Sequence, residues 1–174
     1  NIIPNDFSTK YSRPLVKFAP SNPAVAYVLL YGGYEENGKD VCHLYKIDVA
    51  NETFEDRSAN LPNFANYDKG FINTQQGYNF VLYVKPDDEN FVIVGGTNLF
   101  KSANGFSSKP LDMFIHLYWI GGYEIQDKSN SSYTNHHPDQ HSIAFDPVNP
   151  NVVWSGHDGG LSLTQDITRN GYVI

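Results

Sequence analysis

"SIAFDPVNPNVVWSGHDGGLSLTQD", residues 142–166, predicts three short strands joined by two turns. "SIAF" alternates polar and apolar residues, as a strand with one buried face does. "DPVNP" supplies the Pro and Asn residues that favour a tight connection, and "NVVWSG" is a second strand. Asp158-Gly159 precedes the third strand, "LSLTQ", and Asp-Gly is among the strongest short hairpin signals. We therefore expect a tight hairpin here, with positive φ at Gly159 or Gly160.

The same order of strands and turns occurs twice earlier in the chain. Each copy begins with an apolar residue, any residue and a proline, and these prolines are Pro20, Pro86 and Pro147, spaced 66 and 61 residues apart. The second copy places its glycine-rich turn at residues 95–98, and the first copy has a longer insertion there. Four short antiparallel strands repeated at about this period are typical of propeller blades. A β-sandwich, which also has short strands and frequent turns, is the main alternative.

The predicted fold is all-β, a partial β-propeller of about three four-stranded antiparallel blades near residues 14–58, 78–123 and 138–174. Fourth strands are expected in "TFEDRSA" of the first unit and "MFIHLYWIGG" of the second. No segment predicts a long helix. Three blades cannot close a ring, and an open end exposes strand edges. We therefore expect residues 1–174 to form one incomplete propeller, a fragment completed by remaining blades in the same or another chain.

Composition and charge argue against several function classes. The net charge is −7, and no run of Lys or Arg exceeds two adjacent residues, so we expect no nucleic-acid partner. The longest apolar run is far shorter than the roughly 18 residues that a membrane helix needs. The opening "NIIPNDFSTK" lacks the basic and apolar regions of a signal peptide. Cys42 stands alone, so an internal disulfide is excluded.

The pattern of residues 137–166, with Pro-x-Asn-Pro, an apolar–aromatic pair and Gly-x-Asp-Gly-Gly, resembles the sortilin-like, Asp-box (BNR) class of β-propellers, and its bacterial secreted members most of all. The likeness is weaker over 15–58 and 81–105. The Asp-box, Ser-x-Asp-x-Gly-x-x-Trp, is eroded here to residues 46–48, 102–105 and 164–166. In that family the box is a structural turn after the third strand. The resemblance implies a secreted or cell-surface protein that uses no cofactor and binds a protein, peptide or carbohydrate.

His137, Asp139 and His141 form the densest group of candidate site residues. Imidazole and carboxylate groups are good zinc ligands, and in an extended strand every second side chain shares a face. A metal there would need a fourth donor, and His157 or Asp158 is the nearest by repeat geometry. The alternative is that the triplet marks the start of an inner strand, where a buried face emerges into solvent. We expect no metal, and we interpret these three residues with His157 as a hydrogen-bonded ligand-contact surface.

Paired carboxylates are a second candidate, because glycosidases need one acid and one base or nucleophile. Asp139 and Asp158 lie at strand ends within one unit and are the candidate catalytic residues. The resemblance brings in two enzyme types, sialidases and xyloglucanase-like propellers, which use acids at the rim. Sialidases also need an arginine cluster, whereas the arginines here are dispersed along the chain, at Arg13, Arg57 and Arg169.

Aromatic residues are a third candidate, because exposed Tyr and Trp side chains stack on sugar rings or anchor peptides. Tyr118 and Trp119 of the second unit are therefore added to the predicted ligand-binding residues. Ile143 and Phe145 are expected to face the core. Trp154, in the middle of a strand, is expected to pack between blades.

The function predicted first is a non-enzymatic propeller module that binds a protein, peptide or glycan. A polysaccharide-degrading glycoside hydrolase of the xyloglucanase-like type is the alternative, and a structural part of a larger extracellular assembly is another. An enzyme needs two carboxylates about 5 to 9.5 Å apart at an open cleft. A binding module needs only an accessible surface lined by aromatic side chains.

Overall fold

The computed structural model describes residues 13–34, 39–64, 71–111, 115–124 and 132–170, and the structural statements below concern these residues. The first unit is a four-stranded antiparallel sheet with its strands in chain order. The strands are β1 (Arg13–Ala19), β2 (Asn22–Tyr34), β3 (Asp40–Asp48) and β4 (Thr53–Asp56). A single 3-10 turn, Ser58–Asn60, follows β4.

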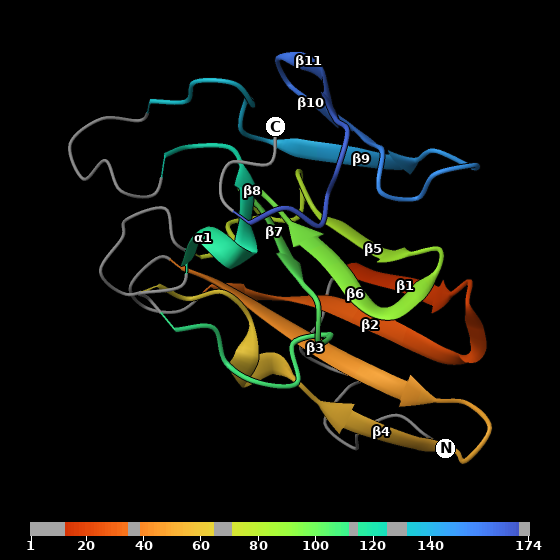
Figure 1. The fold of residues 1–174 in the computed structure, drawn as a ribbon. Helices are drawn as coiled ribbons and strands as arrows, with labels where there is room; N and C mark the ends of the chain where they lie inside the picture. Colours follow the sequence, from red (N-terminus) through yellow and green to blue (C-terminus); the bar gives the residue numbers. More distant parts are fainter. Residues whose placement is uncertain (1–12, 35–38, 65–70, 112–114, 125–131, 171–174) are drawn as a thin grey trace.

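The second and third units form two further antiparallel sheets. The second sheet has four strands, β5 (Val81–Lys85), β6 (Asp88–Gly95), β7 (Leu99–Ser102) and β8 (Trp119–Gly121). The third sheet has three strands among the described residues, β9 (Gln140–Phe145), β10 (Val153–His157) and β11 (Gly160–Thr164). The three sheets are stacked with the second in the middle, and β5 contacts both β1 and β9 (Figure 1). The all-β fold of antiparallel sheets is confirmed, and a fourth strand of the third unit is not seen before residue 170.

The fourth strand of the second unit is shorter than predicted. Ile115–Tyr118 form a helical turn, α1, and only Trp119–Gly121 are extended, while residues 112–114 lie outside the described part. The physical reason is the length of its partner, because β7 has four residues and pairs with β8 at only two positions. No helix in the described ranges is long and apolar enough to cross a membrane.

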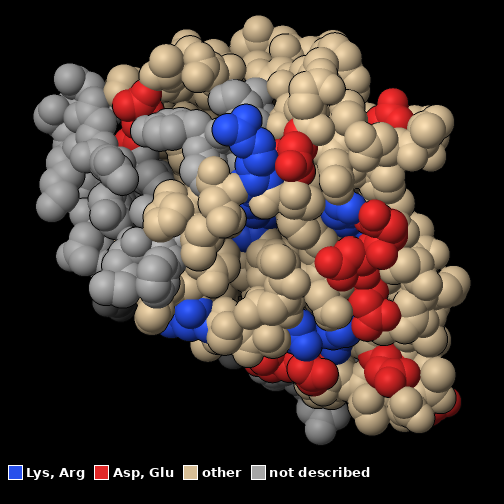
Figure 2. Space-filling model, in the orientation of Figure 1, with Lys and Arg blue, Asp and Glu red and all other residues tan. Residues whose placement is uncertain are grey.

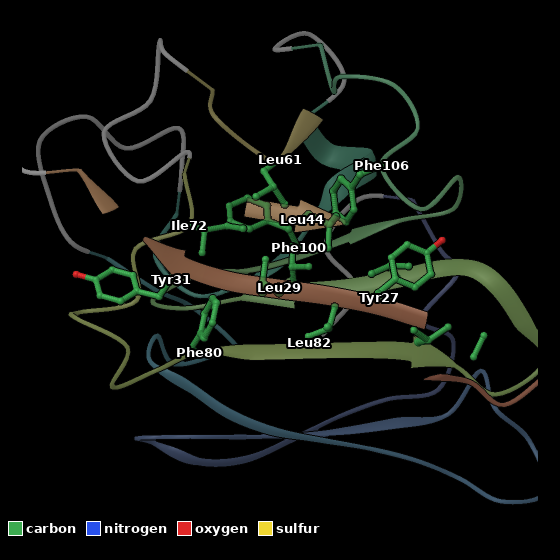
Figure 3. Close-up of a cluster of buried hydrophobic side chains, with 14 of the residues drawn as sticks. Tyr27, Leu29, Tyr31, Leu44, Leu61, Ile72, Phe80, Leu82, Phe100 and Phe106 are labelled. Carbon is green, nitrogen blue, oxygen red and sulfur yellow. The ribbon is translucent and has the colours of Figure 1, made fainter. Parts of the chain in front are cut away.

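Two apolar layers hold the sheets together. The layer between the first and second sheets contains the fully buried Tyr27, Leu29, Leu44, Leu82 and Phe100, which point toward one another in Figure 3. The layer between the second and third sheets is smaller; it contains Phe91, Ile93, Leu99, Ile143, Val153 and Ile167. Because each sheet buries alternate side chains against its neighbour, the alternation read from the sequence is the packing pattern of the stack.

A lysine of the third strand ties each of the first two sheets to the next unit. Lys46 donates to Asn90 Oδ1 at 3.1 Å and lies 3.4 Å from Glu89 Oε1. Lys101 is 3% exposed, and its ammonium donates to the backbone carbonyl of Ile167 at 2.7 Å and to that of Arg169. Burial lowers the pKa of Lys101 to about 8. Through these contacts Lys46 connects the first sheet to the second, and Lys101 connects the second sheet to the third unit.

The turns carry the polar residues that the sequence places there. Asp158-Gly159 is the tip of the β10–β11 hairpin, since His157 pairs with Gly160, and Gly160 has φ of +119°. The predicted hairpin is confirmed. In the second-unit Asp-box remnant, Ser102 Oγ accepts from the Phe106 amide at 2.9 Å. On the face shown in Figure 2, Lys and Arg lie scattered among Asp and Glu, and the described residues there form no continuous basic surface.

Candidate functional site

The candidate site lies where loops of the second and third sheets meet. The segment before β9 brings Tyr133 and His137, β9 itself brings His141, and the β10–β11 hairpin brings His157 and Asp158. The loop before β5 adds Tyr78. These six residues are called the tyrosine–histidine rim below.

Tyr78 and the His141–Asp158 pair form one half of the rim. His141 Nε2 lies 2.5 Å from Asp158 Oδ1, and the hydroxyl of Tyr78 lies 3.5 Å from the same oxygen. The Tyr78 and His141 rings meet edge to face, with centroids 5.2 Å apart. The hydrogen bond from His141 is the main reason that the pKa of Asp158 is lowered. Asp158 is therefore a charged, exposed acceptor at neutral pH.

Tyr133, His137 and His157 form the other half. The Tyr133 and His137 rings lie 4.5 Å apart at an angle of 61°, and the His137 and His157 rings are stacked 6.0 Å apart. His157 Nε2 shares a hydrogen with Ser162 Oγ at 2.8 Å. Burial, and then the neighbouring His137, lower the pKa of His157. His157 is therefore neutral at pH 7, with one ring nitrogen already bonded to the hairpin.

The two tyrosines are the accessible aromatic groups of the rim. Tyr78 is 59% exposed and Tyr133 is 44% exposed, although both rings contact histidines. The loop of Tyr78 is anchored at both ends, because Thr74 Oγ1 donates to Asp40 Oδ2 at 2.6 Å and the buried Asn79 bonds to Asp139. Anchored rings that remain exposed can stack on a ligand with little loss of side-chain entropy.

Asp139 does not share a face with His137 and His141, so this prediction was wrong. β9 begins only at Gln140, and Asp139 has φ of +67°, which breaks the alternation of an extended strand. Its amide donates to the carbonyl of Thr97 at 2.9 Å. Its carboxylate accepts from Asn79 Nδ2 at 2.5 Å and from Gln75 Nε2 at 3.1 Å. Asp139 therefore joins the second unit to the third.

The three residues of the possible metal triplet have separate partners. His137 Nδ1 lies 2.8 Å from the carbonyl of Pro138, His141 is paired with Asp158, and Asp139 is held by two amides. Across the ranges that the structure describes, no group of three or more His, Cys, Asp and Glu side chains could hold a metal ion. The geometry corresponds to a hydrogen-bonded network at these positions.

His136 supports the rim from below and was not among the predicted residues. It is 3% exposed, its Nε2 lies 3.0 Å from Ser155 Oγ, and its ring lies 4.6 Å from that of His157. Burial, reinforced by His157, lowers the pKa of His136 to about 3. The room for this ring comes from Gly121, where an added Cβ would lie 2.4 Å from His136 Cγ. The pairing of a histidine with a distant glycine leaves no local signal in the sequence.

The predicted aromatic residues lie elsewhere. Trp119 is 7% exposed in the layer between the first and second sheets, and the half-buried Tyr118 lies 6.4 Å from the ring of Phe64. Neither belongs to the tyrosine–histidine rim, although Trp119 lines a small cavity together with His136. Ile143 is buried, as expected, whereas Trp154 is 45% exposed on the outer face of the third sheet. The expectation that Trp154 is packed between blades was wrong for this chain, because no described sheet covers that face.

Tyr78 and Tyr133 were not among the predicted ligand-binding residues, because no motif in the sequence around them indicates a binding site. Tyr78 follows the polar loop residues "TQQG", 74–77, and Tyr133 lies in a serine-rich stretch. Only the stacking of the second and third sheets brings these two loops to the same end of the molecule as the histidines. A repeat-based prediction locates the sheets but not the contacts between loops of different units.

Comparison with known proteins supports the architecture. No protein-family model and no curated protein sequence matches the chain. Among solved structures, the chain is similar to the crystal structure of the Niastella koreensis GH74 enzyme, with a TM-score of 0.51 and 20% identity, over 90% of this chain and 22% of that chain. The chain thus spans less than a quarter of the length of that protein. At this identity the likeness concerns the fold alone: three antiparallel sheets that match part of a larger propeller protein.

Proposed function

We propose that the chain is a segment of a secreted or cell-surface propeller of the Asp-box type that binds a glycan at the tyrosine–histidine rim. The observation that carries this proposal is the placement of two exposed tyrosines, Tyr78 and Tyr133, beside a cluster of histidines and a charged carboxylate. The family assignment is supported by the eroded Asp-boxes and by the likeness in fold to a larger propeller.

The chemistry of the rim suits a sugar better than an extended peptide. A pyranose ring offers an apolar face to an aromatic ring and hydroxyl groups around its edge. Asp158 accepts hydrogen bonds from hydroxyls, and the imidazole of His137, whose Nδ1 is bonded to the carbonyl of Pro138, has Nε2 as a further polar atom. Peptide recognition, in contrast, commonly uses main-chain pairing along a sheet edge or an apolar groove, whereas the groups that the rim presents are exposed ring faces and hydrogen-bonding side chains.

A glycoside hydrolase is the second candidate, favoured by the charged state of Asp158 and by the fold likeness to a GH74 enzyme. Hydrolysis needs a protonated acid as well as a base or nucleophile. Asp158, whose pKa is lowered, suits the second role, and the acid would have to be another carboxyl, because the Asp139 carboxylate is already bonded to the side-chain amides of Asn79 and Gln75. Release of reducing ends from a polysaccharide, abolished by Asp158→Asn, would show this activity.

Titration calorimetry with soluble neutral polysaccharides, xyloglucan first among them, tests the binding proposal. Tyr78→Ala removes an aromatic ring that is 59% exposed, and Phe18→Ala removes one that is 57% exposed at the far end of the stack. The proposal predicts that Tyr78→Ala weakens binding about tenfold or more, as the loss of a stacking residue does, and that Phe18→Ala has no effect. Equal effects of both variants, or no binding of any neutral polysaccharide by the folded chain, would contradict it.

A further inference from the structure

A cavity of about 190 Å³, called the Lys39 cavity below, lies apart from the tyrosine–histidine rim. Its walls come from the start of β3, from the segment that follows β4, from residues 71 and 72 before β5, and from Lys109 after β7. Two of its lining residues, Leu61 and Ile72, belong to the apolar layer between the first and second sheets. The cavity is therefore built inside the stack, and neither outer face of the stack contributes to it.

The charged side chains of the Lys39 cavity favour an anion. Its described lining holds the half-buried Lys39, the exposed Lys109 and the carboxylate of Asp40, a formal charge of +1 in a chain whose net charge is −7. Asp40 already has a structural contact, because the amide and the hydroxyl of Thr74 both donate to its Oδ2. Burial, and then Asp40, raise the pKa of the Cys42 thiol to about 12, so this thiol adds no charge. One negative charge in the ligand would balance the lining.

Hydrogen-bonding groups lie beside the two lysines. Oδ1 of Asp40 is buried and has no hydrogen-bond partner among the described residues. A carboxylate oxygen in that state costs free energy, so a hydroxyl group that reaches it is held by a strong, charge-assisted bond. Ser58 Oγ accepts from the Leu44 amide at 3.1 Å, and its own hydrogen can be donated to a ligand. The exposed Asn63 adds an amide that donates and accepts.

The remaining lining is apolar, and the space is small. The ammonium of Lys39 lies 5.0 Å from the centroid of the Phe71 ring, and the buried Pro62 and Ile72 are also lining residues. Pockets for drug-sized ligands have volumes of about 300–1,000 Å³, so a cavity of about 190 Å³ has room for one small ring rather than for a chain. A suitable ligand combines one ring, one anionic group and several hydroxyls.

We propose that the Lys39 cavity binds a sugar acid, a pyranose that carries one carboxylate. The carboxylate pairs with the ammonium groups of Lys39 and Lys109, the hydroxyls bond to Asp40 and Ser58, and the apolar face of the ring contacts Phe71. A neutral sugar leaves both lysines without a ligand anion, and an apolar acid brings no donor to Asp40. The inference concerns a different site from the rim and does not depend on the proposed function of the rim.

Nuclear magnetic resonance titration of the isotope-labelled chain with galacturonate tests the proposal. The expected result is a saturable shift of the amides of Asp40, Cys42 and Ile72. Galactose, which lacks the carboxylate, and cyclohexanecarboxylate, which lacks the hydroxyls, should each bind at least about tenfold more weakly. Equal affinity for cyclohexanecarboxylate or for inorganic phosphate would overturn the proposal, because the cavity would then select for charge alone.

A trimer of galacturonate separates a free sugar acid from the end of a longer acidic glycan. Equal affinities of monomer and trimer indicate a site for a single residue. A trimer that binds more tightly, and that loses this gain in Tyr78→Ala, indicates a glycan that extends from the cavity along residues 72–78 to the rim. Both results support a sugar-acid site in the cavity, and they differ only in the source of the ligand.

Lysine variants locate the binding site. Lys39→Gln and Lys109→Gln should each weaken galacturonate binding about five- to tenfold, as the loss of one accessible ion pair does. Lys17→Gln is the matched control, because Lys17 Nζ also lies over an aromatic ring, 4.6 Å from the centroid of Tyr83, and does not line the cavity. Circular dichroism confirms that each variant is folded. No saturable binding of galacturonate, or an equal loss of affinity in all three variants, would overturn the proposal.

Discussion

His141 Nε2 lies 2.5 Å from Asp158 Oδ1, a contact that joins strand β9 to the tip of the β10–β11 hairpin. It is the largest cause of the lowered pKa of Asp158, and the edge of the Tyr78 ring packs against the same histidine. The pair therefore sets both the charge and the shape of the rim.

Replacing His141 with Gln should raise the pKa of the Asp158 carboxyl toward the value of about 3.9 found in unfolded chains. Tyr78→Phe removes only the more distant hydroxyl, 3.5 Å away, and should change that pKa much less. Carboxyl carbon chemical shifts followed through an acid titration measure both variants. An unchanged Asp158 pKa in His141→Gln would show that the pair does not control its ionisation.

Asp139 is expected to contribute to stability rather than to catalysis. Asp139→Ala removes the shorter of the two hydrogen bonds of the buried Asn79 amide, leaves it the 3.4 Å contact with Thr97 Oγ1, and should lower the free energy of unfolding by about 1–3 kcal/mol. Asp139→Asn retains an oxygen acceptor and a residue type that tolerates positive φ, so its loss should be smaller. Urea unfolding compares the three proteins. A larger loss in the Asn variant than in the Ala variant would contradict this role.

Acid should destabilise the protein through His136 well before the carboxylates are protonated. The pKa of His136 is about 3 in the folded chain, compared with about 6.5 in the unfolded chain. Below about pH 6.5 the unfolded state binds a proton that the folded state does not, so stability falls as pH falls. Between pH 7 and pH 5 the loss from this group is about 2 kcal/mol. The lowered pKa of His157 acts in the same direction.

His136→Gln provides the comparison for this pH dependence, because it removes the titrating ring and keeps a polar side chain. Denaturant unfolding at pH 7 and pH 5 should give a smaller pH-dependent loss in the variant than in the original chain. If both proteins lose the same free energy between these pH values, His136 is not the group responsible.

Two glycines should differ in the cost of an added methyl group. At Gly96 a Cβ would lie 2.1 Å from the backbone oxygen of Asn73, so Gly96→Ala must displace backbone and should cost about 3 kcal/mol. At Gly160, φ is +119° and no atom lies within 4 Å, so Gly160→Ala should cost only the backbone strain of about 1–2 kcal/mol. Thermal and urea unfolding would reveal the order, and the reverse order would contradict the close contact at Gly96.

The arrangement of strands could be predicted because it depends on local alternation and on turn residues. The hairpin at Asp158-Gly159 and the burial of Ile143 follow from a few neighbouring residues. The rim could not be predicted in the same way. The positive φ of Asp139 is imposed by its contacts with Thr97 and Asn79, which lie some 40 to 60 residues away in the sequence. A strand pattern assumes extended backbone and so misplaces such a residue.

The exposure of Trp154 shows a second limit of prediction from the sequence. The pattern correctly marks it as a residue of a sheet face, but burial depends on whether another sheet covers that face. The buried His136 opposite Gly121 shows a third, because only tertiary packing relates the two residues. Local patterns thus predicted the sheets, while contacts between units determine the candidate site.

The central claim, that the rim binds a glycan, is tested most directly by nuclear magnetic resonance titration of the isotope-labelled chain with a xyloglucan oligosaccharide. The account predicts that the largest amide shifts occur at Tyr78, Tyr133, His141 and Asp158. A rival location is the cavity of about 190 Å³ beside Lys39 and Cys42, at the end of the first sheet. Shifts concentrated around that cavity, with the amides of the rim unchanged at saturation, would contradict the claim.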